Sequence, residues 1–409
     1  MNNKPLFSIF LVVLIDMLGF SLILPLLPYY ATTFGAGTIE TGLLIGSYAL
    51  AQLIGSPLLG RLSDRFGRRP ILLVSVFGTF VGFLLMGFAN SLWMLFVARI
   101  LDGVTGGNIS VAQAYISDVT DASNRSRGLG MIGAAFGLGF IIGPVTGGFL
   151  SQWGYQMPAW FAAALSLANL ALIAAWLPES LPAEKRSTEN ASRPAITLGA
   201  LLDALRKPFT GALLTSRFVF GVAFAIFQTL FSLYALQKFK LGAIQTGYIL
   251  TYVGILSVIT QGYLVGKITR LFREDFLIVT CVAIMAGSMF AWGWVPSVPL
   301  LLFVMAPMSL AGGTLNTLLS STLSKAVATT EVGGILGLST AIESSTRVIA
   351  PVLGGWLLQQ FGTAAPGIFG GVALVALAIY TYKAIYRHPL ALQIATNPKT
   401  PSAVGGDSH

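Results

Sequence analysis

Long apolar runs separated by short polar segments dominate this chain of 409 residues. Twelve runs of roughly 20 residues are each long enough to cross the ~30 Å hydrocarbon core of a bilayer as a helix. Backbone groups in lipid need internal hydrogen bonds, and uninterrupted runs of this length favour helices over a closed barrel. The predicted spans are Leu6–Pro28, Thr41–Leu59, Pro70–Ala89, Leu92–Ile116, Leu129–Leu150, Pro158–Leu177, Phe209–Leu236, Thr246–Val265, Phe276–Val295, Val298–Leu323, Gly333–Leu358 and Pro366–Ile385.

An internal repeat and a polar linker divide the twelve spans into six and six. "GPVTGG" at 143–148 recurs as "APVLGG" at 350–355, and "GRLSDRFGRR" at 60 has a diverged counterpart, "GKITRLFRED", at 266. The two offsets, 207 and 206 residues, are nearly equal and indicate a duplicated six-helix unit. We therefore predict an all-α membrane protein with two pseudo-symmetric bundles, organised as an N-terminal bundle (1–177), a cytoplasmic linker (178–208), a C-terminal bundle (209–387) and a loose tail (388–409).

The composition supports membrane insertion and narrows the chemistry. Only 10% of the residues are charged, against about 25% in soluble domains. The single cysteine, Cys281, excludes a disulfide framework, and the two histidines, His388 and His409, lie outside every predicted span. The sequence contains no P-loop, nucleophile triad or metal constellation. We expect neither an enzyme nor a cofactor, and a proton gradient rather than ATP as the energy source.

The distribution of basic residues predicts the orientation. With the N-terminus inside, cytoplasmic segments hold 19 of the 24 lysine and arginine residues and outer loops hold 2. This asymmetry is what the positive-inside rule requires of two cytoplasmic termini. The net charge of +9 therefore reflects topology, and no nucleic-acid partner is expected. We interpret the first run as a retained span, since no Ala-x-Ala-like cleavage site follows it.

Between the second and third spans, a short segment concentrates charge and small residues. Gly60 and Gly67 permit close contact and a tight turn, and the arginines hold this segment at the cytoplasmic face. Asp64 and Arg65 are predicted to be the two halves of a breakable ionic latch, although topogenic charge alone is the simpler alternative. The complete pattern is Gly60, Asp64, Arg65, Gly67, Arg68 and Arg69.

This pattern resembles the loop signature of the major facilitator superfamily. Arg99 with Gly103 resembles the Arg-x-x-x-Gly element of the same family, and "GLGFIIGPVTGG" at 137–148 resembles the motif of its drug/proton antiporters. "DMLGFSLILPLLP" at 16–28 resembles the first span of tetracycline efflux pumps. The resemblance implies two bundles that rock about a central cavity, and a cytoplasmic latch with Asp118 as carboxylate partner. Arg270 stands where the repeat would place Asp64, so we expect the latch to be asymmetric.

Three acids are predicted to lie near mid-bilayer, because each falls ten residues into its span: Asp16, Asp102 and Glu343. Desolvation at this depth favours the neutral form of a carboxyl group, which suits proton loading and release near neutral pH. Asp16 is the strongest candidate, since its own helix offers no basic partner. Asp102 and Glu343 are spaced to pair with Arg99 and Arg347 on their own helices, either as static bridges or as protonation switches.

Small and polar residues complete the predicted site. Gly143, Pro144, Gly147 and Gly148 let interface helices approach closely, in a hinge or a packing role. A further set suggests an amphipathic cavity, although each member is individually more typical of interhelical hydrogen bonding. This set is Tyr48, Gln52, Asn108, Gln113, Gln228, Tyr252 and Asn316.

The sequence therefore predicts a proton-coupled secondary transporter that exports small lipophilic or amphipathic compounds. Tetracycline itself is not expected, because the acids that the pumps carry in spans three and nine are missing. Two alternatives stay open: proton-coupled uptake of a sugar or organic anion, and transport of amphipathic lipids. We expect a monomer in a bacterial inner membrane, with protons, lipid and a small-molecule substrate as partners.

Overall fold

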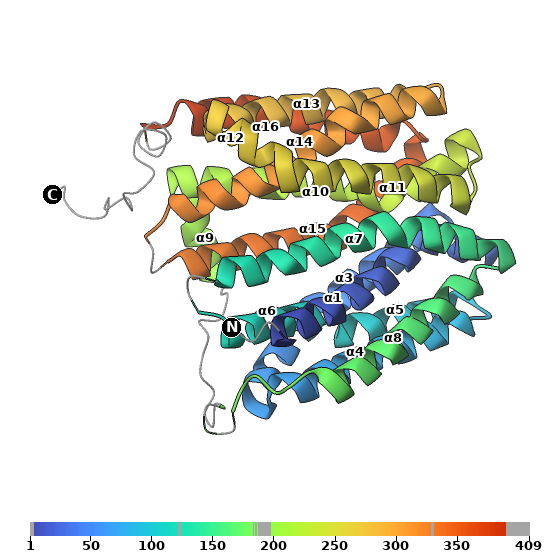
Figure 1. The fold of residues 1–409 in the computed structure, drawn as a ribbon. Helices are drawn as coiled ribbons and strands as arrows, with labels where there is room; N and C mark the ends of the chain where they lie inside the picture. Colours follow the sequence, from blue (N-terminus) through green and yellow to red (C-terminus); the bar gives the residue numbers. More distant parts are fainter. Residues whose placement is uncertain are drawn as a thin grey trace. The chain divides into compact units, whose positions relative to one another are not determined.

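The computed structural model describes residues 4–121, 124–182, 184, 186, 198–328 and 331–389. Every regular element within these residues is helical (Figure 1). The first half contains α1 (Lys4–Ile23), α2 (Leu27–Thr33), α3 (Thr38–Phe66), α4 (Arg68–Gly87), α5 (Leu92–Thr105), α6 (Asn108–Val119), α7 (Arg125–Leu150), the 3₁₀ turn η1 (Ser151–Trp153) and α8 (Gln156–Trp176). The second half contains α9 (Leu198–Arg206), α10 (Pro208–Phe239), α11 (Ala243–Ile259), α12 (Val265–Leu271), α13 (Glu274–Trp294), α14 (Val298–Lys325), α15 (Val332–Phe361) and α16 (Ala365–Thr381), with π-helical turns η3 (Thr260–Leu264) and η4 (Tyr382–Tyr386).

Ten helices of the described residues are long and apolar enough to cross a membrane. These ten include a helix from each predicted span except the fourth and the eleventh, α15. Two of the predicted spans are interrupted. The first becomes α1 and α2, because Pro25 lacks the N–H that would continue the helix and its ring clashes with the preceding turn. The fourth becomes α5 and α6, separated at Gly106 and Gly107.

The polar linker contains an element that the sequence pattern did not predict. The short helix α9 ends directly before α10, and a Cβ on Gly211 would lie 2.1 Å from the Leu205 carbonyl oxygen. Glycine at this position therefore lets α9 fold back against the start of α10. Residues 187–197 of the linker and 390–409 of the predicted tail lie outside the described residues.

The chain separates into two compact units. Unit 1 comprises Met1–Ala191, Thr229–Ile255 and Pro351–Gln360, and unit 2 comprises Ser192–Gln228, Leu256–Ala350 and Phe361–His409. The ends of α10 and α15 and most of α11 thus contribute to unit 1, although most of the second half forms unit 2. The simpler boundary at 178–208 stays a prediction from the sequence.

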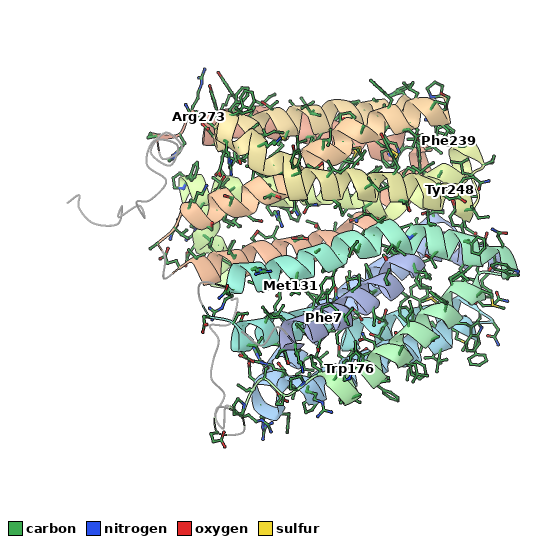
Figure 2. The ribbon with its side chains drawn as sticks, viewed as in Figure 1. Phe7, Met131, Trp176, Phe239, Tyr248 and Arg273 are labelled. Atoms are coloured by element: carbon green, nitrogen blue, oxygen red, sulfur yellow. The ribbon has the colours of Figure 1, made fainter. Side chains whose placement is uncertain are left out.

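Each unit is held together by apolar packing between helices. In unit 1, α1 packs against α7 and α8, and α4 lies beside α8 and α5 (Figure 1). In unit 2, α13 packs against α14 and α16, and the fully buried Trp292 ring meets Phe227 edge-on at 5.3 Å. Large apolar side chains also point outward, among them Phe7 and Trp176 of unit 1 (Figure 2). Such exposed apolar residues are what a lipid-facing surface requires.

Candidate functional site: buried charges in two helical units

Asp16 lies on α1 beside the start of α6. The side chain of Asn108, the first residue of α6, lies within hydrogen-bonding reach of the Asp16 carboxyl group, and Asp102 is close enough to interact with it electrostatically. Asp16 takes part in no ion pair among the residues that the structure describes. The break between α5 and α6 thus turns an amide side chain toward the acid of α1.

The predicted ion pair between Arg99 and Asp102 is present. Arg99 Nη1 lies 3.0 Å from Asp102 Oδ2, and both side chains are at least 95% buried. The guanidinium carbon also lies 4.1 Å from the centre of the Tyr48 ring, a cation–π contact. Arg99 Nε has no hydrogen-bond partner among the described residues. The pair is therefore neutral in charge but not fully satisfied in hydrogen bonding.

A polar stripe on α3 faces this pair. Tyr48, Gln52 and Ser56 follow each other at intervals of four residues, which places them on one face of the helix. Gln52 Nε2 donates to the Gly106 carbonyl oxygen at 3.0 Å, and Ser56 Oγ lies 3.2 Å from Ser110 Oγ. Gln52 therefore binds a carbonyl group that the helix break leaves without its usual partner, which is an interhelical role.

Unit 2 contains a charge cluster that combines three helices. Arg217 of α10 donates from Nη2 to Glu343 Oε2 at 2.6 Å and from Nη1 to Asn316 Oδ1 at 2.6 Å. Arg347 Nη2 donates to Glu343 Oε1 at 2.8 Å, which confirms the predicted pairing of these two residues. Sequence reasoning missed Arg217, although it is one of only three arginines within the spans. Helical spacing reveals partners on one helix and gives no sign of a partner on another.

The remaining predicted cavity residues differ in exposure. Gln113 of α6 and Gln228 of α10 are exposed, and Tyr252 of α11 is half-buried. Gln113 and Arg99 stand fourteen residues apart, a spacing that would put them on one face of a continuous helix, but the break at Gly106 and Gly107 ends the helical register between them. No group of three or more His, Cys, Asp or Glu side chains that could hold a metal ion occurs in the described part of the chain.

At the loop between α3 and α4, Arg68 rather than Arg65 is the partner of Asp64. Arg68 Nη1 lies 2.6 Å from Asp64 Oδ1, and Arg68 Nε lies 3.0 Å from Asp118 Oδ2, as expected for the carboxylate partner of the latch. Arg65 instead lies over the Phe66 ring, with 5.3 Å between the guanidinium carbon and the ring centre. The predicted pairing of Asp64 with Arg65 was wrong, because Gly67 (φ 103°) ends α3 and turns Arg68 back toward α3.

A carboxylate from the start of the linker caps α4. Glu179 Oε1 accepts from the Arg68 backbone N–H at 2.8 Å, and Glu179 Oε2 accepts from the Arg69 backbone N–H at 3.2 Å. A negative charge here satisfies two of the N–H groups that a helix start leaves unpaired and complements the helix dipole. The Arg69 side chain donates to the carbonyl oxygens of Ile173 and Ala174 at the end of α8. The close contact expected at Gly60 was wrong, since none of the described residues lies within 4 Å of a Cβ built there.

Unit 2 repeats the Arg68–Asp118 pair with the charges exchanged. Lys325 Nζ lies 2.6 Å from Glu274 Oε1, and these residues follow Asp118 and Arg68 by 207 and 206 positions. In the first half the basic residue, Arg68, belongs to α4, whereas in the second half the basic residue, Lys325, belongs to α14. The two halves thus place an ion pair at equivalent positions but exchange which residue is acidic and which is basic.

Near this pair, the hydrogen bond to Asp275 raises the pKa of Arg273 above its usual value.

The glycine–proline motif of α7 lies against α1. A Cβ on Gly143 would come within 2.1 Å of Ser21 Oγ, and one on Gly147 within 2.5 Å of the Leu22 carbonyl oxygen. Gly148 approaches Ala243 at the start of α11, and the Pro144 carbonyl oxygen faces Gly247. The motif therefore holds close backbone contacts of the helix that carries Asp16.

Comparison with known proteins assigns the family. The model of the Major Facilitator Superfamily matches residues 9–296. The chain belongs to this superfamily. It is 32% identical to the class H tetracycline resistance protein of Pasteurella multocida over 358 residues, covering 86% of this chain and 88% of that protein. It is 29% identical to human solute carrier family 67 member A1 over 376 residues, covering 89% and 88%.

A solved structure supports the same fold. The crystal structure of the nucleoside transporter NupG has a TM-score of 0.75 at 16% identity, and the match covers 95% of this chain and all of that one. The chain is thus a multi-pass membrane transporter with the major facilitator fold, and not an enzyme. A tetracycline resistance protein and a nucleoside transporter share this fold, so the fold does not identify the substrate, which has to be argued from this chain's own residues.

Proposed function

We propose that the chain is a proton-coupled efflux antiporter for small lipophilic or amphipathic compounds, working by alternating access. We place both termini in the cytoplasm of a bacterial inner membrane and regard the protein as a monomer. Asp16 is the group at which protons act, and substrate competes with them there. The similarity to a tetracycline resistance protein supports export as the direction.

The proposal depends on one difference between Asp16 and the other buried acids, which is that Asp16 has no arginine partner among the described residues. Asp102 is paired with Arg99, and Glu343 is paired with Arg217 and Arg347. In both pairs the acid is the counter-charge of an arginine, so protonation of the acid would leave that arginine unpaired. Among the residues that the structure describes, Asp16 interacts with a neutral amide, Asn108, and with another acid, Asp102. It can therefore gain and lose a proton without an arginine being left unpaired.

The position of Asp16 links its charge to helix movement. Asp16 is on α1, and the glycine face of α7 packs directly against α1 at Ser21 and Leu22. Ser21 Oγ also donates to the Gly139 carbonyl oxygen of α7 at 2.7 Å. A change in charge or contact at Asp16 is thus passed to a helix pair that is packed backbone to backbone.

The test compares Asp16→Asn with wild type in proteoliposomes, using a panel of dyes and antibiotics under an imposed pH gradient. We expect Asp16→Asn to bind substrate while gradient-driven transport is lost, because the amide cannot take up a proton. Glu40→Gln is the matched control, since it removes a carboxylate from the first turn of α3, and it should transport like wild type. Gradient-driven transport by Asp16→Asn at the wild-type rate would contradict the proposal.

A further inference from the structure

The charge cluster of unit 2 holds more positive than negative charge. Two guanidinium groups, Arg217 and Arg347, share the single carboxylate of Glu343 at 2.6 and 2.8 Å. The other acidic side chains that the structure describes in unit 2 are already paired near helix ends, in Asp203–Arg206, Glu331–Lys207, Asp275–Arg273 and Glu274–Lys325. One positive charge in the middle of the unit is therefore not balanced by the described residues.

The unbalanced charge is located on Arg347. The Arg217 side chain is 9% exposed, and both of its terminal nitrogens donate to Glu343 or Asn316. The Arg347 side chain is 54% exposed, and Glu343 is its hydrogen-bond partner among the described residues. A guanidinium group has two edges with two donors each, Nε with Nη2 and Nη1 with Nη2, and the bond from Nη2 to Glu343 uses a single N–H group. One edge of Arg347 thus remains available to an anion.

The face of α15 that carries Arg347 is polar. Thr340, Ser344 and Arg347 follow each other at helical spacing, with Glu343 beside them. A charged side chain within a membrane span faces a bundle interior or a water-filled path, because exposure to hydrocarbon is too costly. The exposed guanidinium group of Arg347 therefore belongs to the polar face of α15 and not to a lipid-facing one.

We propose that the transported compound is an amphipathic organic acid whose oxyanion binds Arg347. A planar guanidinium group matches the two oxygens of a carboxylate or sulfonate, and such an anion brings the charge of the cluster of Arg217, Glu343 and Arg347 to zero. Glu343, itself bound by Arg217, positions Arg347 by accepting from one of its terminal nitrogens. This inference rests on the proposed transport function and adds the charge class of the substrate.

The test uses two probes with the same bicyclic ring size and fixed charge, 2-naphthalenesulfonate and N-methylquinolinium. Neither charge changes with pH, so a pH gradient acts on the protein alone. In proteoliposomes we expect wild type to transport the sulfonate. Arg347→Gln should raise its KM roughly tenfold or more, and Arg347→Lys should raise it less, because the charge is kept but the fork is lost. Arg206→Gln removes an exposed arginine of the same unit and should match wild type.

A binding measurement separates lost recognition from lost folding. Arg347→Gln leaves the Arg217–Glu343 pair in place, so we expect a monodisperse protein whose Tm no longer rises with 2-naphthalenesulfonate. If that variant does not fold, Arg347→Lys gives the same comparison with its charge retained. Wild-type transport of N-methylquinolinium alone, of neither probe, or an unchanged sulfonate KM in the Arg347 variants would overturn the inference. Sulfonate transport without a response to the pH gradient would instead refute proton coupling and leave the anion site standing.

Discussion

Replacing Gly143 by alanine tests whether the α7 motif is a close-packing device. The added methyl group would lie 2.1 Å from Ser21 Oγ and 2.9 Å from the Leu22 backbone nitrogen. Ser21 can rotate away only by giving up its hydrogen bond to the Gly139 carbonyl oxygen, which is worth about 1 kcal/mol. The Leu22 nitrogen can move only with α1 itself, and overpacking of this kind costs about 1–3 kcal/mol.

A second glycine of α7 supplies the matched control. Nothing lies within 4 Å of a Cβ built on Gly130, so Gly130→Ala gains the helix propensity of alanine, about 1 kcal/mol, without a clash. Gly143→Ala gains the same amount, and the difference between the two variants isolates the steric term. We expect Gly143→Ala to be less stable than Gly130→Ala by at least about 2 kcal/mol.

Thermal unfolding of purified protein in detergent, followed by the loss of the monodisperse peak, measures the difference. The variant Ser21→Ala/Gly143→Ala should recover part of the loss, because one of the two colliding atoms is gone while the Leu22 nitrogen remains. Equal Tm values for Gly143→Ala and Gly130→Ala would refute the reasoning. In that case α1 and α7 could separate without cost, and the motif would have no packing role.

Three further outcomes are expected. Reversing the charge of one partner, with Glu274→Lys or Lys325→Glu alone, should lower stability by about 1 kcal/mol, and the double variant Glu274→Lys/Lys325→Glu should restore it. A double-mutant cycle based on Tm measures this coupling. Asp102→Asn should lower the free energy of unfolding by about 3–5 kcal/mol, because Arg99 is left buried without a counter-charge. Adding Arg99→Gln should recover stability, and an unchanged stability of the single variant would contradict the buried pair. Gly67→Ala should cost about 1–3 kcal/mol, since φ is 103° and the new Cβ meets the carboxylate that caps α4, whereas Gly60→Ala should be tolerated.

Some of the charged site could be predicted because its partners are close in sequence. Arg99 with Asp102 and Glu343 with Arg347 are three and four residues apart on continuous helices, and the structure contains both pairs. The pairing of Asp64 with Arg65 failed because adjacent helical residues point in different directions. No periodicity could reveal Arg217, because the chain separates it from Glu343 by 126 residues.

By itself the sequence determined that this chain lies in a membrane, that it is helical, and where the charges occur along it. These properties follow from local rules: the length of apolar runs, the cost of charge in lipid and the spacing of residues on one helix. Only the tertiary structure decided which charges meet. Asp16 has an amide as neighbour, Arg347 keeps a free edge and Glu179 caps α4 because separate helices pack against one another, and the direction of each side chain depends on that packing.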